Sequence, residues 1–175
     1  MSMRLGLRSL AVVLLVSLGG CDMGSLMIKE HRSPFDFDAT IATIIANANA
    51  RGWEVSKVFN FEKSLLAHGQ PDPGPMTVIK LCSPEFASRM FADDDAKFVS
   101  VMAPCSISVY EKADGSTFVA TMNMGLMSKL MGNDVGQVLA DIAADDNRIL
   151  AFTRASPESS NPQAAAPQVS VSAGQ

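Results

Sequence analysis

The stretch that decides the fold is predicted to form a pair of strands. Its sequence is Ser106-Ile107-Ser108-Val109-Tyr110-Glu111-Lys112-Ala113-Asp114-Gly115-Ser116-Thr117-Phe118-Val119-Ala120-Thr121-Met122-Asn123-Met124. Two segments rich in apolar and β-branched residues, 106–111 and 117–124, flank Ala113-Asp114-Gly115-Ser116. An Asp-Gly pair between two such segments is typical of a β-hairpin turn. The stretch therefore predicts an antiparallel strand pair. Within the second strand, we expect one buried face made by alternating residues, namely Phe118, Ala120, Met122 and Met124.

Further strands are predicted at 26–32, 53–59, 76–82 and 98–102. In the segment 53–59, Trp53, Val55 and Phe59 are expected on one side. Helices are predicted at 61–68 and 85–91, from Asp36 or Asp38 to Arg51-Gly52, and from Asn133 or Asp134 onward, while 125–131 is helical or irregular. This order predicts an α+β fold, with a mainly antiparallel sheet covered by helices on one face.

The start of the chain has the pattern of an export signal. Arg4 and Arg8 precede a short apolar run, and the tetrapeptide Leu18-Gly19-Gly20-Cys21 follows. This tetrapeptide resembles the lipobox of bacterial lipoproteins, which implies acylation (palmitate) at Cys21 after removal of residues 1–20. An ordinary secretory signal that happens to contain a cysteine is the alternative. Asp22 resembles the inner-membrane retention signal of enteric lipoproteins, although export to the outer membrane stays open.

These features divide the chain into a signal peptide at 1–20, a lipidated cysteine and short tether at 21–25, one domain at 26–150, and a polar tail at 151–175 that we expect to be disordered. The chain carries 14 Lys and Arg against 18 Asp and Glu. Loss of Arg4 and Arg8 leaves 12 against 18, or −6, in the mature protein. This charge argues against nucleic acid as a partner. Membrane attachment would therefore depend on acyl chains.

Several short motifs occur in a characteristic order and spacing across residues 26–150. They are Ser33-Pro34-Phe35-Asp36, Arg51-Gly52-Trp53, Leu81-Cys82-Ser83-Pro84-Glu85-Phe86-Ala87, Met102-Ala103-Pro104-Cys105-Ser106-Ile107-Ser108-Val109-Tyr110-Glu111, the Asp114-Gly115 turn, and Asn123-Met124-Gly125-Leu126-Met127. In these the chain resembles the bacterial and archaeal domain-of-unknown-function family 302. The resemblance implies a fold similar to that of the TATA-binding protein and a tendency to form homodimers, and it implies no activity. It also implies that a cysteine pair at Cys82 and Cys105 marks a subgroup.

Cys82 and Cys105 are the thiols that remain if Cys21 is acylated, and three interpretations of them stay open. A disulfide suits an exported protein, but Cys105 shares a strand side with Ile107, whereas Cys82 lies on the side opposite Leu81. The sulfurs would then leave opposite faces unless Cys82 lies past the strand end. The second interpretation is a pair of buried, reduced thiols, and the third is a redox or soft-metal site.

The soft-metal interpretation draws on methionines, because thiolates and thioethers suit Cu(I). Those close to Cys105 in the sequence are Met102, Met122, Met124, Met127 and Met131. Methionine is more often core filler, however. His31 and His68 have no partner at zinc-ligand spacing, so each is expected to be a surface or hydrogen-bonded residue.

We therefore expect a lipid-anchored, periplasm-facing accessory or binding protein of the cell membrane, which the resemblance implies is a homodimer. The sequence does not identify its protein partner or small ligand. Catalytic motifs such as Gly-x-Ser-x-Gly and phosphate-binding glycine loops do not occur in the sequence. The alternative is a thiol-based redox or copper-handling protein that uses Cys82 and Cys105.

Overall fold

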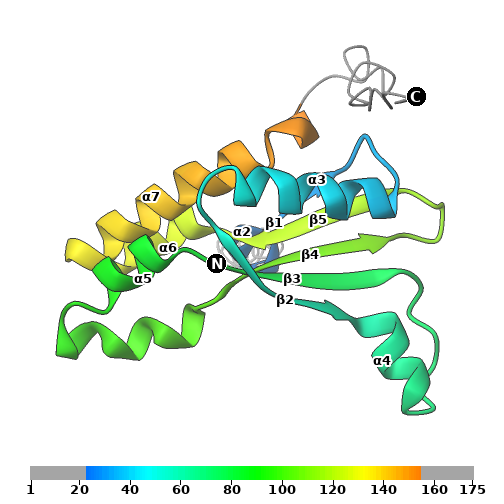
Figure 1. Ribbon diagram of the computed structural model, residues 1–175, viewed down its shortest axis with the longest axis horizontal. Coiled ribbons are helices and arrows are strands. Elements are labelled where there is room, and N and C mark those ends of the chain that lie inside the picture. Colours follow the sequence, from blue (N-terminus) through cyan, green and yellow to red (C-terminus); the bar gives the residue numbers. More distant parts are fainter. Residues whose placement is uncertain (1–22, 155–175) are drawn as a thin grey trace, which may run out of the picture.

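A single antiparallel sheet forms the centre of the computed structural model, which describes residues 23–154. Its strands are β1 (Ile28–Arg32), β2 (Glu54–Asn60), β3 (Met76–Cys82), β4 (Cys105–Glu111) and β5 (Thr117–Met122). They pair in the order β1-β5-β4-β3-β2 (Figure 1). The predicted hairpin is confirmed, since β4 pairs with β5 in a register that sets Val109 opposite Val119. Gly115 in the turn has a φ of 76°, a value that glycine adopts at little cost.

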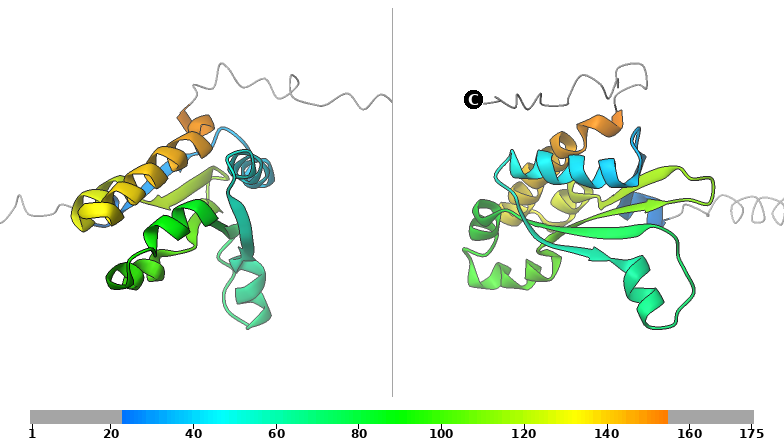
Figure 2. Two further views of the ribbon diagram at one scale, coloured as in Figure 1. Left: turned by 60° about the vertical axis from the view of Figure 1, so that its left-hand side comes forward. Right: turned by 45° about the vertical axis from the view of Figure 1, so that its right-hand side comes forward.

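Helices cover one face of this sheet, as the sequence predicts. The α-helices of the described residues are α2 (Met23–Met27), α3 (Phe37–Asn49), α4 (Phe61–Ala67), α5 (Pro84–Met90), α6 (Met124–Met131) and α7 (Asn133–Ile149). Two 3-10 helices, η1 (Asp94–Met102) and η2 (Ala151–Arg154), complete the described elements. The long helices α3 and α7 lie on the same side of the sheet, whereas α4 projects from the end of β2 (Figures 1 and 2).

Local sequence explains where these helices begin. The side chain of Asp36 accepts a hydrogen bond of 2.8 Å from the amide of Ala39 and caps α3. Ser83 caps α5, and Pro84 takes the first helical position, where a missing amide hydrogen costs nothing. Gly52, with a φ of 76°, redirects the chain from α3 into β2.

The core lies between the covered face of the sheet and the helices. Strand alternation supplies Ile79, Leu81, Ile107, Val109 and Val119, each at most 1% exposed. Their neighbours in sequence point to the opposite, open face and are half-buried, except Ser106, which is exposed. Phe118, Ala120 and Met122 lie on that open face, so the expectation that they form a buried strand face is wrong. Met124 belongs to α6 and not to the strand.

Two other expectations are corrected by local geometry. Residues 98–102 are not a strand but part of η1, whose start is capped by Asp93. The strand is predicted from the apolar residues of this segment. Two of them, Phe98 and Val101, are 69% and 87% exposed in η1. In β2, the register shifts between Val55 and Lys57. This β-bulge sends Val55 and Phe59 to opposite faces, not to the same face as alternation alone suggests.

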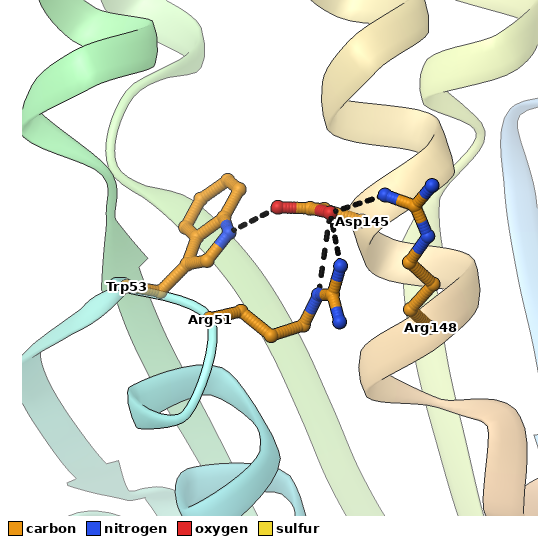
Figure 3. A network of polar contacts seen from close by, with 4 residues as sticks. All are labelled: Arg51, Trp53, Asp145 and Arg148. Atoms are coloured by element: carbon orange, nitrogen blue, oxygen red, sulfur yellow. Dashed lines mark hydrogen bonds and ion pairs between the residues drawn. The ribbon is translucent and has the colours of Figure 1, made fainter.

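A polar network joins the start of β2 to α7 (Figure 3). One carboxylate, that of Asp145, accepts hydrogen bonds from Arg51 (3.2 and 3.0 Å), from the indole of Trp53 (3.1 Å) and from Arg148 (3.0 Å). Burial alone would raise the pKa of Asp145, but these donors outweigh it and the pKa is lowered. The network thereby fixes α7 over the sheet.

The two ends of the chain are described only in part. Signal residues 1–20, Cys21, Asp22 and residues 155–175 lie outside the described residues. Of the tail expected from residue 151, the first four residues form η2. There Phe152 stacks on Phe35 with ring centroids 5.5 Å apart, and Arg154 donates to the backbone oxygen of Asn147. Among residues 23–154, no helix has the length and apolar character needed to cross a membrane.

Candidate functional site

A pocket under α5 and α7 brings together most of the sulfur atoms singled out from the sequence. Cys82 ends β3 and Cys105 begins β4, and both line this pocket. Met102 and Met124 line it as well. Met122 does not line it. Met122 ends β5, where it borders the open-face groove and also packs against the edge of the core. Four of the five predicted site residues therefore meet at one place.

Sequence reasoning missed a fifth sulfur in this pocket, that of Met90. Met90 ends α5 and is 6% exposed. Nothing local in the sequence links it to Cys105, because they meet only through the packing of α5 against the sheet. We call the set Cys82, Met90, Met102, Cys105 and Met124 the sulfur cluster.

Both cysteines of the cluster are free thiols in the structure, which therefore has no disulfide between them. Cys105 lies opposite Leu81 in the β3–β4 register, so its side chain is directed to the covered face. Cys82 alternates to the other side but sits at the last position of its strand, and this end position lets it line the pocket.

The environment of Cys105 favours its protonated form. Burial is the main cause that raises its pKa to about 12, and the charges of Asp146 and Cys82 add to the effect, while Lys80 opposes it. A thiol with this pKa carries almost no thiolate at neutral pH. The site therefore holds Cys105 as a neutral thiol at neutral pH.

The pocket is small and apolar. Its volume is about 30 Å³. Besides the sulfur cluster, its walls include Trp53, Phe86, Leu139 and Ile142. A void of this size exceeds the ~10–15 Å³ that one water requires, and it is far below the ~300–1,000 Å³ of a site for an organic ligand.

A second cluster of charged groups lies between β1 and α7. Lys29, His31, Asp146 and Arg154 line a cavity of about 10 Å³. Burial raises the pKa of Asp146 to about 7, with Lys29 opposing and Asp145 adding to the shift. Burial also lowers the pKa of His31, helped by the charges of Arg154 and Lys29. His31 is half-buried here, whereas His68 is exposed beside the backbone oxygen of Ser64, 2.7 Å from its Nδ1.

The sequence contains a signal for the Asp146 cluster. Asp145 and Asp146 follow Ile142 by three and four positions, and Ile142 is buried in the core. Acidic residues at this spacing fall on the apolar side of a helix. A carboxylate there needs either donors, as Asp145 has, or a proton, as the raised pKa of Asp146 indicates.

A wider groove runs over the open face of the sheet. Its volume is about 400 Å³. It is lined by Ile28, Val78, Lys80, Val101, Met102, Ser106, Ser108, Ala120 and Met122, among others. Apolar side chains flank a polar centre, where Lys80 donates to the hydroxyl of Ser106 at 2.6 Å. This groove is large enough for a small molecule or for side chains of a protein partner.

Comparisons with known proteins identify the family but no activity. The family model "Domain of unknown function DUF302" matches residues 29–152. The solved structure described as "uncharacterized conserved protein DUF302 from Bacillus stearothermophilus" is similar, with a TM-score of 0.65 and 20% sequence identity over 73% of this chain and 98% of that one. No curated protein matches the chain. Because the family model spans most of the sequence and the fold agrees, the chain belongs to the DUF302 family.

Proposed function

We propose that this DUF302 protein is a lipid-anchored, periplasm-facing binding or accessory protein, which acts as a homodimer at the membrane surface. The observation that carries the binding role is the open face of the sheet. The long helices α3 and α7 cover the other face (Figure 2), and the groove over Val78, Ser108 and Ala120, bordered by the end of η1 and the start of α6, stays accessible. A solvated sheet face is normally polar, whereas this one mixes apolar and charged side chains, as binding surfaces do.

Support for the anchor comes from the sequence. The basic and apolar segments before Cys21 fit an export signal, and Asp22 favours retention at the inner membrane. Only four residues separate Cys21 from Leu26, and Leu26 and Ile28 are 46% and 47% exposed. At about 3.5 Å per residue, a lipid on Cys21 would hold the domain within a short distance of the bilayer. The groove would then act close to the membrane surface.

The anchor is tested by metabolic labelling with radioactive palmitate followed by membrane fractionation. We expect label and membrane association for the wild type and loss of both for Cys21→Ser. The double variant Cys82→Ser/Cys105→Ser is the control, because it removes the two other cysteines, leaves Cys21 in place and should keep the label. An unchanged label on Cys21→Ser would contradict the proposal. Replacement of Asp22 by Ser should shift the protein toward the outer membrane.

The binding role is tested by photo-crosslinking in cells. A benzophenone amino acid at Ser108, in the groove, should give a crosslinked species, and the same group at the exposed Gln70 should not. A product of twice the chain mass identifies the second copy. A product of another mass would replace the homodimer with a different protein partner, and no product at Ser108 would contradict a macromolecular partner at this face.

The thiol-redox alternative receives less support from the site. Redox exchange begins with a thiolate, and the pKa of Cys105 is raised to about 12 mainly by burial. At neutral pH the Cys105 thiol would be a poor nucleophile.

A further inference from the structure

The sulfur cluster combines features that core packing alone does not require. Two cysteines and three methionines line one pocket, and they come from four parts of the chain: the end of β3, the end of α5, the junction of η1 with β4, and the start of α6. The other described lining residues include no carboxylate and no imidazole. Sulfur is the only type of strong metal ligand that this pocket offers, and sulfur ligands select soft ions such as Cu(I).

Size limits the ligand to a single atom or ion. A volume of about 30 Å³ leaves room for one such particle between Cys105 and the facing side chains. An organic ligand would need roughly ten times that volume or more. The pocket is also apolar, with Trp53 and Leu139 in its wall, so a bound ion must be compensated in charge.

Charge and softness together select the ion. When a monovalent cation replaces the Cys105 proton, one thiolate balances one positive charge, and neutral thioethers complete the ligand set without adding charge. Zn²⁺ instead takes about four ligands from Cys, His, Asp and Glu. Across residues 23–154, no group of three or more such side chains is placed to hold a metal. Thioethers are ligands for Cu(I) rather than for Zn²⁺.

We propose that the sulfur cluster is a binding site for a soft monovalent metal ion, Cu(I), with Cys105 as the thiolate ligand and with Cys82, Met102, Met90 and Met124 as the available supporting sulfurs. Binding releases the thiol proton to solvent and transfers no electron, since copper enters and stays as Cu(I). This inference rests on the proposed binding function, because it names a ligand for it. It uses the pocket under α5 and α7. Met102 and Met124 also line the groove on the open face, whereas Cys82, Met90 and Cys105 do not.

The test is an anaerobic titration of the full chain, extracted in detergent, against a chromophoric Cu(I) chelator. We expect one Cu(I) per chain for the wild type. Cys105→Ser should weaken binding by about 100-fold, on the scale of a lost ligand. Met102→Leu should weaken it by about tenfold, and Met122→Leu, a thioether on the open face, is the matched control and should leave it unchanged.

The pH dependence gives a second readout that a structural role would not produce. Each thiol proton displaced by the ion makes the apparent affinity rise about tenfold per pH unit. A tenfold rise per unit assigns one thiolate, and a hundredfold rise assigns both Cys82 and Cys105. Binding that does not change with pH would overturn the thiolate assignment.

Fluorescence reports whether the ion enters this pocket. The chain has a single tryptophan, Trp53, and it lines the pocket. Ag(I), a soft monovalent ion that undergoes no redox cycling here, should change Trp53 emission with the same stoichiometry as Cu(I), and Zn²⁺ should not compete. The melting temperature of each variant is measured alongside. If Cys105→Ser fails to fold, the comparison of Met102→Leu with Met122→Leu decides the question.

Two results would overturn the site: no Cu(I) bound by the folded wild type, or equal affinity in the folded Cys105→Ser variant and the wild type. The cluster would then be core packing. Such a failure leaves the proposed binding function standing if Ser108 still crosslinks to a partner. Conversely, Cu(I) binding without any crosslink at Ser108 would contradict a macromolecular partner at the groove and would support the metal site.

Discussion

Two adjacent aspartates of α7 show how completely environment determines the behaviour of one residue type. Asp145 accepts hydrogen bonds from Arg51, Trp53 and Arg148, and its pKa is lowered. Asp146 is half-buried, and its pKa is raised to about 7 by burial. The charged form of one aspartate stabilises the fold, and the charged form of its neighbour destabilises it.

Replacement of Asp145 by Ala should lower the free energy of unfolding by about 2 kcal/mol at pH 7, because the indole of Trp53 loses its acceptor in a buried position. A lowered folded-state pKa stabilises the protein above the unfolded value of about 4, and this contribution disappears as the pH falls through the folded value. Denaturant unfolding from pH 7 to pH 3 measures both effects. The control Asp141→Ala, in a solvent-exposed pair with Arg89, should lower the free energy of unfolding much less than Asp145→Ala does. Equal losses for the two variants would contradict the assignment.

Replacement of Asp146 by Asn should raise the free energy of unfolding at neutral pH, whereas replacement of Asp145 lowers it. With a folded-state pKa of about 7 and an unfolded value of about 4, the wild type binds an extra proton when folded between these values. Its stability therefore falls as the pH rises from about 4 to 7. The variant should match the wild type near pH 4 and exceed it by about 2–4 kcal/mol at pH 8. Parallel unfolding curves for both proteins at the two pH values would show that Asp146 is ionised in the folded state.

Elements were more predictable than the contacts between them. Local signals located α3, α5 and the β4–β5 hairpin, because the Asp36 cap, Ser83-Pro84 and Asp114-Gly115 act within a few residues. The bulge in β2 has no such signal. It reverses the direction of Phe59, and only the pairing with β3 reveals it. The expected strand at 98–102 failed because the apolar Phe98 and Val101 are exposed.

The candidate site follows the same division. Its chemistry was visible in the sequence, since Cys82, Cys105, Met102 and Met124 could be selected as soft ligands. The sequence did not show which sulfur-containing residues line the pocket. Met90 of α5 lines it, whereas Met122 borders the open-face groove because of strand alternation. Packing of helices on a sheet decides which sulfurs meet, and a sequence read alone does not specify that packing.

The contact between α6 and α7 depends on one glycine. A Cβ added at Gly136 would lie 2.6 Å from the backbone oxygen of Ser128, which has no freedom to move aside. Gly136→Ala should therefore lower the melting temperature, although alanine within a helix is by itself favourable by about 1 kcal/mol. Gly125→Ala is the matched control, since its nearest neighbour is a side-chain oxygen at 3.6 Å. We expect the control to be neutral or stabilising in a thermal melt. A stabilised Gly136→Ala variant would show that the two helices can separate.

At the scale of the whole molecule, one face of the sheet is packed against helices and the other face is partly exposed. The covered face packs Ile79, Ile107 and Val119 against helices, whereas Val78, Ser108 and Ala120 form a row across the open face in register. A twofold axis through this row would place each copy's groove against the other's, which is the self-complementary arrangement of most homodimers. Burial of the apolar side chains then supplies the free energy of association.

The homodimer is tested by placing charge in the middle of that row. Ser108→Lys/Ala120→Lys adds two positive charges on half-buried positions outside the core. The two lysines face each other on paired strands, so the monomer should fold with a stability lowered by no more than about 1 kcal/mol, which a melt checks. Across a twofold interface the four lysines would face one another, and like charges brought together in an interface cost several kcal/mol. Sedimentation should therefore show a dimer for the wild type and a monomer for the double variant. The control Ala67→Lys/Gln70→Lys adds the same charge at exposed positions at the end of α4 and in the loop after it, and it should stay dimeric. A wild type that sediments as a monomer, or a double variant that remains a dimer, would place any self-association away from the open face.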